Sequence, residues 1–332
     1  MKNHRRKLIK FGLFWLAILV IVACSGTFFS FWQKPTETEF GATFSNIYAE
    51  SLGLDWQDTY MAVLNDLQVK KIRIPIYWST IERSVDEYDF SDIDWMMRQA
   101  QWSGVDVTLV VGAKVPRWPE CFYPDWVSSE DVAYRKQAHL DFLTQTVERY
   151  AKHSALERWQ IENEPFFPFG NCPPPDSILL DEEIALVKTY DQEHSIQLTS
   201  SGEQSLWLVN GSRAEVLGVS LYRVVWNDIL GYWVFPFPPA FYRIQNFLVS
   251  PLVNEVVISE MQAEPWITDE MLTWSSGKKY ELFNQQDLRD NVEFARRTGI
   301  NKIYFWGVEW WYYLKTQGDD RLWETGKEII NH

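Results

Sequence analysis

The sequence predicts an α/β protein whose main domain is a single (β/α)₈ TIM barrel, preceded by an apolar segment near the N-terminus. Short strand-like runs alternate with segments of helical periodicity, which implies a parallel sheet. Eight strand candidates fit into the roughly 290 residues after the apolar segment, a usual length for a closed barrel. A doubly wound open sheet is the alternative. It would normally carry a Gly-x-Gly-x-x-Gly turn after its first strand, and that motif is absent.

The N-terminal region combines a basic flank with a long apolar run. Residues 1–10 hold five Lys or Arg and no acid, and residues 11–32 hold no charged residue. Such a run can cross a hydrocarbon core about 30 Å thick, and the basic flank predicts that the N-terminus stays in the cytoplasm. We therefore expect a single-pass transmembrane anchor at 11–32, a linker at 33–39 and a barrel domain at 40–332 outside the cytoplasm.

Two alternatives also place the barrel outside the cytoplasm. The apolar segment can be a signal peptide that is removed from a secreted protein. Ile21-Val22-Ala23-Cys24 also resembles a lipoprotein signal, in which Cys24 is lipidated after cleavage. The apolar run continues past Cys24 to Trp32, which favours an uncleaved anchor.

Charge and histidine placement exclude several classes of function. The net charge is −14; beyond residues 1–10 the chain has 26 basic and 45 acidic residues, a net charge of −19. An acidic body argues against nucleic acid and polyanionic sugars as partners. Two histidines are terminal, and the others lie on or beside predicted helices: His139, His153 and His194. We therefore expect no catalytic metal, and no motif points to a nucleotide cofactor or a serine nucleophile.

The predicted strands are apolar or β-branched runs bounded by turn residues. In chain order they are Phe40–Phe44, Lys71–Ile76, Val105–Val111, the stretch Trp159–Pro165, Ser195–Thr199, Val216–Tyr222, Val256–Glu260 and Lys302–Trp306.

The predicted helices show apolar residues at helical spacing. They are Asp58–Leu67, Ser91–Trp102, Ser128–Ala151, Leu180–His194, Tyr242–Leu248, Gln285–Gly299 and Arg321–Ile330. We expect Ser91 to cap its helix, with two aspartates in the first turn and Gly104 as the stop.

Two cysteines are placed for pairing. Cys121 and Cys172 follow the third and fourth predicted strands, so both should lie on the same rim of the barrel. In an exported protein such a pair is a disulfide candidate. The alternative is two separate buried thiols.

Two predicted strands run into a glutamate. Pro165 has no N–H and restricts the preceding residue to extended geometry, so we expect Glu164 to be extended at the end of the fourth strand. Glu260 ends the seventh strand. The carboxyl ends of parallel strands meet on one rim, where two carboxylates can be held at a fixed separation, as glycoside hydrolysis requires. Either glutamate alone is equally compatible with a solvated strand end.

With these residues, the chain resembles the retaining glycoside hydrolases with (β/α)₈ barrels called clan A, which include cellulases, β-mannanases, β-xylosidases and β-galactosidases. Asn163-Glu164 matches the Asn-Glu pair at the end of the clan's fourth strand, and Glu260 matches the glutamate at the end of its seventh strand. The resemblance implies that Glu164 is the general acid/base and Glu260 the nucleophile. It also implies that Asn163 binds the 2-hydroxyl of the sugar.

Three further residues match clan positions: Arg73 an arginine beneath the nucleophile, Tyr222 a tyrosine bonded to it, and Trp306 a tryptophan under the sugar. Arg73 and Tyr222 would favour an ionised Glu260. Glu164 must start protonated, which a less polar setting or the charge of Glu260 would favour. Each match has a structural alternative: an interior ion pair for Arg73, a filled barrel mouth for Tyr222 and core packing for Trp306.

The loops after the strands supply weaker candidates. Several clan members carry a sugar-contacting histidine near the end of the third strand, where this chain has Gly112-Ala113-Lys114. Lys114 is therefore a candidate for that task. Other candidate sugar platforms, about half of them expected to be structural, are Trp78, Trp118, Trp126, Trp207, Trp233 and Trp266.

The resemblance implies a membrane-anchored retaining β-glycosidase that acts on a β-linked oligo- or polysaccharide without a cofactor. The alternative is a catalytically inactive sugar-binding barrel at the cell surface. The joint presence of Glu164, Glu260 and Asn163 argues against it, because a binding module needs no matched acid and nucleophile.

Overall fold

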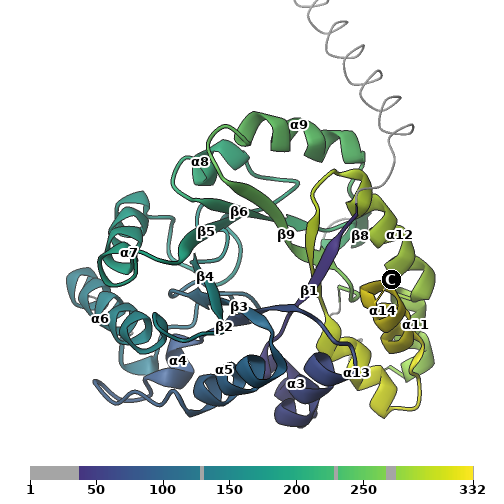
Figure 1. Cartoon of the computed structure of the whole chain (residues 1–332), viewed down its shortest axis with the longest axis horizontal. Coiled ribbons are helices and arrows are strands. Elements are labelled where there is room, and N and C mark those ends of the chain that lie inside the picture. Colours follow the sequence, from purple (N-terminus) through teal and green to yellow (C-terminus); the bar gives the residue numbers. More distant parts are fainter. Residues whose placement is uncertain (1–36, 128–130, 228–230, 267–273, 332) are drawn as a thin grey trace, which may run out of the picture.

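The computed structural model describes residues 37–127, 131–227, 231–266 and 274–331. Eight parallel strands close into a barrel with the order β1-β10-β9-β6-β5-β4-β3-β2, and helices surround it (Figure 1). The barrel strands follow one another around the ring in chain order. Their numbers skip β7 and β8 because these two strands form a separate hairpin between β6 and β9. The predicted (β/α)₈ barrel is confirmed.

Most barrel strands begin and end within two residues of the prediction. The exception is the fourth, which starts earlier and ends before the glutamates. The strands are β1 (Glu39–Thr43), β2 (Lys71–Pro75), β3 (Asp106–Val111), β4 (Leu156–Ile161), β5 (Ser195–Ser200), β6 (Val216–Leu221), β9 (Glu255–Gln262) and β10 (Lys302–Trp306).

The helices form the outer layer. Those that follow the strands in turn are α3 (Trp56–Asn65), α5 (Ser91–Ser103), α6 (Val132–Tyr150), α7 (Ser177–Tyr190), α8 (Trp207–Gly211), α9 (Pro239–Val249), α12 (Gln285–Arg297) and α14 (Arg321–Asn331). The connections hold further elements: α2 (Asn46–Ser51), α4 (Trp78–Ile81), η1 (Asp125–Val127), β7 (Val224–Asn227), β8 (Gly231–Val234), α11 (Ser276–Leu282) and α13 (Val308–Thr316).

Helix ends show where local sequence signals were sufficient. Gly104 follows α5 with φ of 64°, a left-handed conformation that glycine adopts easily, and it ends the helix as predicted. Ser91 is the first residue of α5, and the N-cap position is Phe90, which makes no side-chain capping hydrogen bond, so the prediction that Ser91 caps the helix is wrong. Asp131 caps α6, and the predicted start of that helix at Ser128 lies outside the described residues.

The barrel strands bury two chemically different faces. Outward side chains such as Ile72, Leu109 and Trp159 join the apolar core under the helices. Arg73 on β2 reaches Gln160 on β4 at 2.7 Å although β3 lies between these strands, so this bond runs through the barrel interior. The interior is therefore a polar network, whereas the interior of most such barrels is packed with branched apolar residues.

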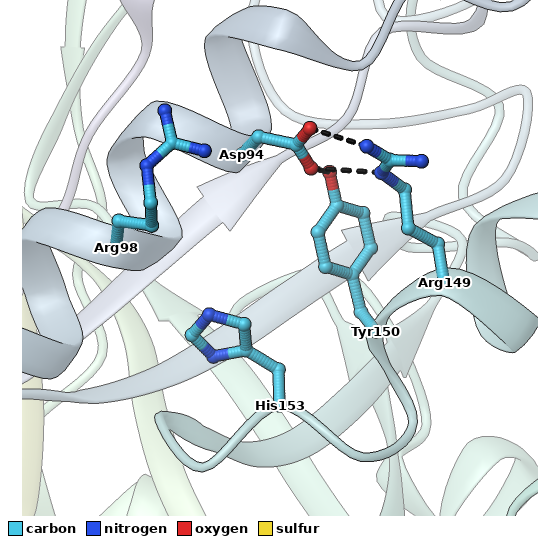
Figure 2. Close-up of a pocket in the computed structure, with 5 residues that line it drawn as sticks. All are labelled: Asp94, Arg98, Arg149, Tyr150 and His153. Atoms are coloured by element: carbon cyan, nitrogen blue, oxygen red, sulfur yellow. Dashed lines mark hydrogen bonds and ion pairs between the residues drawn. The ribbon is translucent and has the colours of Figure 1, made fainter.

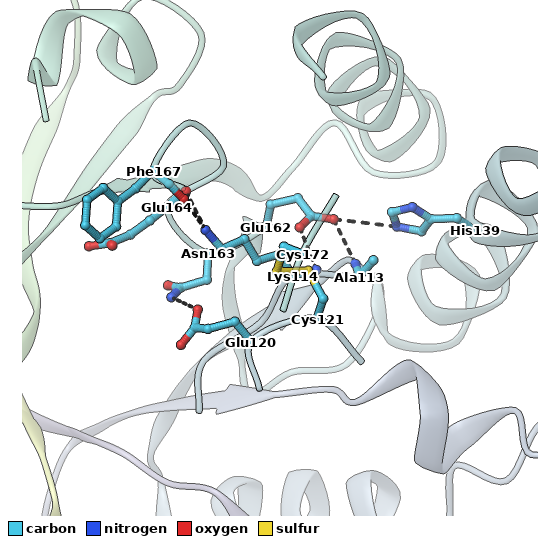
Figure 3. The surroundings of a disulfide bond; sticks show 10 residues. All are labelled: Ala113, Lys114, Glu120, Cys121, His139, Glu162, Asn163, Glu164, Phe167 and Cys172. Carbon is cyan, nitrogen blue, oxygen red and sulfur yellow. Dashed lines mark hydrogen bonds and ion pairs between the residues drawn. A yellow bond between two sulfur atoms is a disulfide. The ribbon is translucent and has the colours of Figure 1, made fainter. Parts of the chain in front are cut away.

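A disulfide joins the loops after β3 and β4. Cys121 and Cys172 are bonded, with 5.3 Å between their Cα atoms (Figure 3). This confirms the predicted pairing and ties together the loops on the carboxyl-terminal rim.

The predicted N-terminal segments lie almost wholly outside the described residues. These are the basic flank, the apolar run at 11–32 with Cys24, and the linker up to residue 36. Within the described ranges, no helix combines the length and the apolar character needed to cross a bilayer.

Candidate active site

Arg73 is the centre of the polar network. Its Nη1 donates to Glu260 Oε1 at 2.8 Å, its Nη2 to Asn163 Oδ1 at 2.9 Å and its Nε to Gln160. The side chain is 1% exposed. One buried guanidinium thus connects two of the residues that the resemblance singles out, and it pairs with a carboxylate as the sequence predicted.

A bulge in β9 turns Glu260 into the barrel. Ile258 and Met261 both pack in the outer core, although residues three apart in a regular strand face opposite sides. The pairing with β6 and with β10 shifts register at Ser259, as one extra residue in the strand would cause. Glu260 therefore faces the interior, where the Tyr222 hydroxyl donates to its Oε2 at 3.1 Å.

Tyr222 is held in place by a glutamate that the sequence reading missed. Glu203 lies in the loop after β5, and its Oε1 accepts the Tyr222 N–H at 2.9 Å and the Tyr242 hydroxyl. Burial raises the pKa of Tyr222 well above its ordinary value, with the charge of Glu260 adding to the effect. The phenol therefore stays protonated and remains a donor to Glu260.

Glu164 is not extended, contrary to the prediction. Its φ is 45°, in the left-handed region, and β4 ends three residues before it at Ile161. Tertiary bonds override the local preference before Pro165. The Glu164 N–H donates to Thr199 Oγ1 at 2.8 Å, and its carbonyl accepts Lys114 Nζ at 3.1 Å. Glu164 thus sits in a bend beyond the strand end, fixed by Thr199 on β5 and by Lys114 in the loop after β3.

The electrostatic setting of Glu164 favours its protonated form. Burial is the main cause, and the negative charges of Glu260 and Glu120 add to it, so that the pKa of Glu164 is raised to about 8. Lys114 and a hydrogen bond from Ser220 oppose the shift without cancelling it. Glu164 is therefore mainly protonated at pH 7.

Glu120 is a third buried carboxyl group at this site. Its Oε2 accepts a hydrogen bond from Asn163 Nδ2 at 3.1 Å, while Asn163 Oδ1 accepts from Arg73 (Figure 3). Burial, followed by the charge of Glu260, raises the pKa of Glu120 to about 8. One weak signal for Glu120 was available from the sequence, because this residue precedes Cys121, whose predicted disulfide lies on this rim.

Arg117 forms a second buried charge cluster against Trp306. Its guanidinium lies 4.0 Å from the Trp306 ring centroid and 3.6 Å from that of Tyr48. It also pairs with Glu264 and with Glu309, the latter at 3.1 Å. Trp306 is 8% exposed, so only a small part of the indole that Arg117 leaves uncovered can meet a ligand.

Two weaker candidates do not have the setting that a sugar contact needs. Trp78 is 0% exposed and stacks on Phe142 in the core, so the prediction that it is a sugar platform is wrong. Lys114 is buried, and its Nζ donates to the carbonyls of Glu164 and Phe167. Its amine thus holds the loop of Glu164 in place, which is a positioning task in place of the proposed sugar contact.

A separate surface pocket lies between α5 and the end of α6 (Figure 2). Asp94 accepts hydrogen bonds from Arg149 Nε and from the Tyr150 hydroxyl, each at 2.8 Å. The acid in this pocket is therefore already paired with its neighbours. The pocket lining is Asp94, Arg98, Arg149, Tyr150 and His153, which includes none of the predicted site residues.

The carboxyl-terminal rim thus brings two different carboxyl groups together. Glu164 is mainly protonated near neutral pH, and Glu260 accepts hydrogen bonds from the Arg73 guanidinium and the Tyr222 hydroxyl. This is the division of tasks that acid-assisted nucleophilic substitution needs. The resemblance implied that Glu164, Glu260, Arg73, Asn163 and Tyr222 lie together, and their contacts with one another and with shared partners bring them to one rim.

Solved structures share this fold. A GH5_18 structure from Streptomyces cattleya in complex with GlcNAc is 12% identical, with a TM-score of 0.54 over 82% of this chain and 71% of that chain. A GH5_18 variant from Bifidobacterium longum subsp. longum in complex with Manβ1-4GlcNAc is 11% identical, with a TM-score of 0.58 over 89% and 78%. Endo-glycoceramidase II from Rhodococcus sp. is 13% identical, with a TM-score of 0.50 over 82% and 73%.

No protein-family model matches the chain, and no curated protein does. At these identities the likeness concerns the fold. The chain therefore has the (β/α)₈ barrel found in solved glycoside hydrolases, and the fold that the resemblance to clan A implied is confirmed.

Proposed function

We propose that this chain is a retaining β-glycosidase with Glu164 as the general acid/base and Glu260 as the nucleophile. One observation carries the proposal. Arg73 and Tyr222 both donate to the Glu260 carboxylate, while burial and the charge of Glu260 raise the pKa of Glu164 to about 8. Glu164 thus holds a proton near neutral pH, while Glu260 faces a cation and a hydroxyl donor, which is the arrangement from which a double displacement would start.

In the first step, a Glu260 oxygen attacks the anomeric carbon of a β-linked sugar. The bond from that carbon to the leaving oxygen breaks, and this oxygen takes the proton of Glu164. The product is a glycosyl ester on Glu260 and an ionised Glu164. Retaining enzymes hold these carboxyl groups about 5–5.5 Å apart, which leaves no room for a water between them and the sugar.

In the second step, esterification has removed the charge of Glu260 that favoured the proton on Glu164. Glu164 can then accept a proton from a water molecule as that water attacks the same carbon. The ester bond breaks, Glu260 regains its charge and the sugar leaves with its original configuration. Asn163, fixed by Arg73 and Glu120, is the proposed ligand of the sugar 2-hydroxyl.

The test uses the full-length protein in detergent with a panel of aryl β-glycosides and β-linked polysaccharides. We expect hydrolysis by the wild type, with proton NMR showing the β-anomer as the first product. A 2-deoxy-2-fluoro glycoside of the active sugar should label Glu260, which peptide mass spectrometry can locate. An α-anomer as first product, or label on another residue, contradicts the assignment. Sugar binding without turnover favours the inactive sugar-binding barrel.

We also propose that residues 11–32 anchor the barrel to the outer face of a membrane. The support is the uncharged run and its basic flank, as described from the sequence. We expect the protein in the membrane fraction, with the barrel open to protease added outside intact cells. A Cys24→Ala variant distinguishes a transmembrane anchor from a lipid attached to Cys24. Loss of membrane attachment in this variant would show that the protein is a lipoprotein.

A further inference from the structure

A second group of buried titratable side chains lies behind the site, between the barrel wall and two helices. It consists of His139 on α6, Glu162 just after β4, and Glu183 on α7. One ligand atom from each residue lies within 4.8 Å of the others. His139 Nε2 is 3.7 Å from Glu162 Oε1, and Nδ1 is 3.6 Å from Glu183 Oε1 (Figure 3 shows His139 and Glu162).

Two of these side chains, His139 and Glu183, are buried with polar atoms that lack the hydrogen bonds buried groups normally form. His139 is 2% and Glu183 1% exposed. Distances of 3.6 Å and 3.7 Å are too long for hydrogen bonds. Within the described structure, His139 Nε2 and Glu183 Oε2 have no hydrogen-bond partner. Because leaving a buried acceptor unpaired is unfavourable, two such atoms on one cluster indicate that something binds between them.

The charge of the cluster indicates a cation. Among the described residues, no lysine or arginine forms an ion pair with Glu162 or Glu183; each pairs with His139 alone. A neutral imidazole offers the lone pair of one ring nitrogen, and His139 Nε2 has no hydrogen-bond partner within the described structure. Glu162 is already fixed for such a role, since its two oxygens accept the N–H groups of Ala113 and Lys114 at 2.8 Å and 2.7 Å.

We propose that His139, Glu162 and Glu183 bind a divalent cation, with Zn²⁺ as the ion that matches one imidazole nitrogen and two carboxylates, and a water as the fourth ligand. Tetrahedral Zn²⁺ with bonds of about 2.0–2.1 Å holds its ligand atoms about 3.4 Å apart. The ligand atoms, one from each residue, lie within 4.8 Å of one another, and the 3.7 Å and 3.6 Å contacts use different ring nitrogens of His139. Ion binding therefore requires that one nitrogen turns toward both carboxylates and that the three side chains draw together. The proposal does not depend on glycosidase activity.

The ion has a structural task on this geometry. It joins α6 and α7 to the segment that leads from β4 into Asn163 and Glu164. Through Glu162 it also holds the loop of Lys114, whose amine binds the Glu164 carbonyl. Gly112 leaves room for this arrangement, because a Cβ there would lie 2.5 Å from Glu162 Oε1.

The test measures metal content and thermal stability of the full-length protein in detergent. After chelator treatment, the protein is incubated with ZnCl₂, desalted and analysed by plasma mass spectrometry. We expect about one Zn²⁺ per chain and a Tm several degrees above that of the chelated protein, because an ion that binds only the native state stabilises it. The expected metal loss in Glu183→Gln is nearly complete, and its Tm should no longer respond to ZnCl₂.

Glu183→Gln also distinguishes a metal site from the alternative in which His139, Glu162 and Glu183 only share protons with one another. Glutamine has the shape of a protonated glutamate, so without a metal site the variant should equal or exceed the wild type in Tm. His194→Gln is the matched control, because it removes another histidine–carboxylate pair, with Asp191 at 2.7 Å, outside the cluster. Wild-type protein that retains no Zn²⁺, or Glu183→Gln that retains as much as His194→Gln, overturns the proposal.

Discussion

The two ends of the barrel hold glutamates in opposite electrostatic settings. At the amino-terminal ends of the strands, Glu157 lies between Lys71 at 2.6 Å and Arg158 at 2.9 Å. Burial opposes its ionisation, but the two cations outweigh burial and the pKa of Glu157 is lowered. At the carboxyl-terminal ends, burial and the charge of Glu260 raise the pKa of both Glu164 and Glu120 to about 8.

The difference comes from the cations that contact each buried glutamate. In the amino-terminal cluster Glu255 accepts from Arg158 at 3.0 Å and from Lys302 at 2.7 Å, so Glu157 and Glu255 each meet two cations, while Lys71 also pairs with Asp106 at 3.0 Å and with Glu39 at 3.9 Å. On the other rim, the one ion pair that Arg73 forms among the described residues is with Glu260, and Lys114 donates to carbonyls. One rim therefore stabilises charge, and the other stores a proton that a reaction can use.

The largest expected effect contrasts the two ends of β9. Glu260→Gln should lower kcat on the order of 10⁴–10⁶-fold, because the proposed nucleophile loses its charge. Glu255→Gln, at the other end of the same strand, should leave kcat nearly unchanged. Steady-state kinetics with an aryl β-glycoside compare them. Equal losses in both variants would mean that Glu260 acts only through the fold.

A smaller loss is expected for Glu164→Gln, about 10²–10⁴-fold in kcat/KM, since removal of a general acid has this effect. In the wild type, Glu164 loses its proton as the pH rises through about 8, so kcat/KM should fall on the alkaline side. The variant should lack that fall. A pH profile of kcat/KM for both proteins measures it, and an unchanged alkaline limb would assign the acid to another group.

The variant Arg158→Met tests the ion pairs at the amino-terminal end of the barrel. Loss of the Arg158 guanidinium leaves Glu157 and Glu255 each with one cation fewer, which should lower the free energy of unfolding by about 3 kcal/mol. Urea denaturation measures this change. Arg213→Met is the control, because its ion pair with Asp181 is exposed and should contribute less than about 1 kcal/mol. Similar losses in both variants would contradict a special role for the buried cluster.

The smallest effect concerns the pH dependence of stability. Between the ordinary glutamate pKa of 4.5 and about 8, native Glu120 keeps a proton that the unfolded chain releases. Its contribution to stability is therefore present below pH 4.5 and is lost as the pH rises to 8. Glu120→Gln should show a smaller fall in unfolding free energy between pH 5 and pH 8. Urea titrations at both values check this, and parallel losses in both proteins would remove Glu120 as a cause.

Local sequence signals determined the framework of this protein. Alternating periodicities located the eight strands, Gly104 ended its helix, and the position of Cys121 and Cys172 after successive strands anticipated their bond. The resemblance to clan A, and not local periodicity, brought Arg73 and Tyr222 to Glu260, and both side chains contact its carboxylate.

Tertiary structure alone decided the surroundings of those residues. The left-handed turn at Glu164 and the burial of Trp78 depend on partners far away in the chain, which no local pattern contains. Glu120 and the His139 cluster likewise become neighbours of the site only when loops and helices pack. The local sequence determines which strand carries a side chain. The pKa and the exposure of that side chain depend instead on all the groups that pack around it.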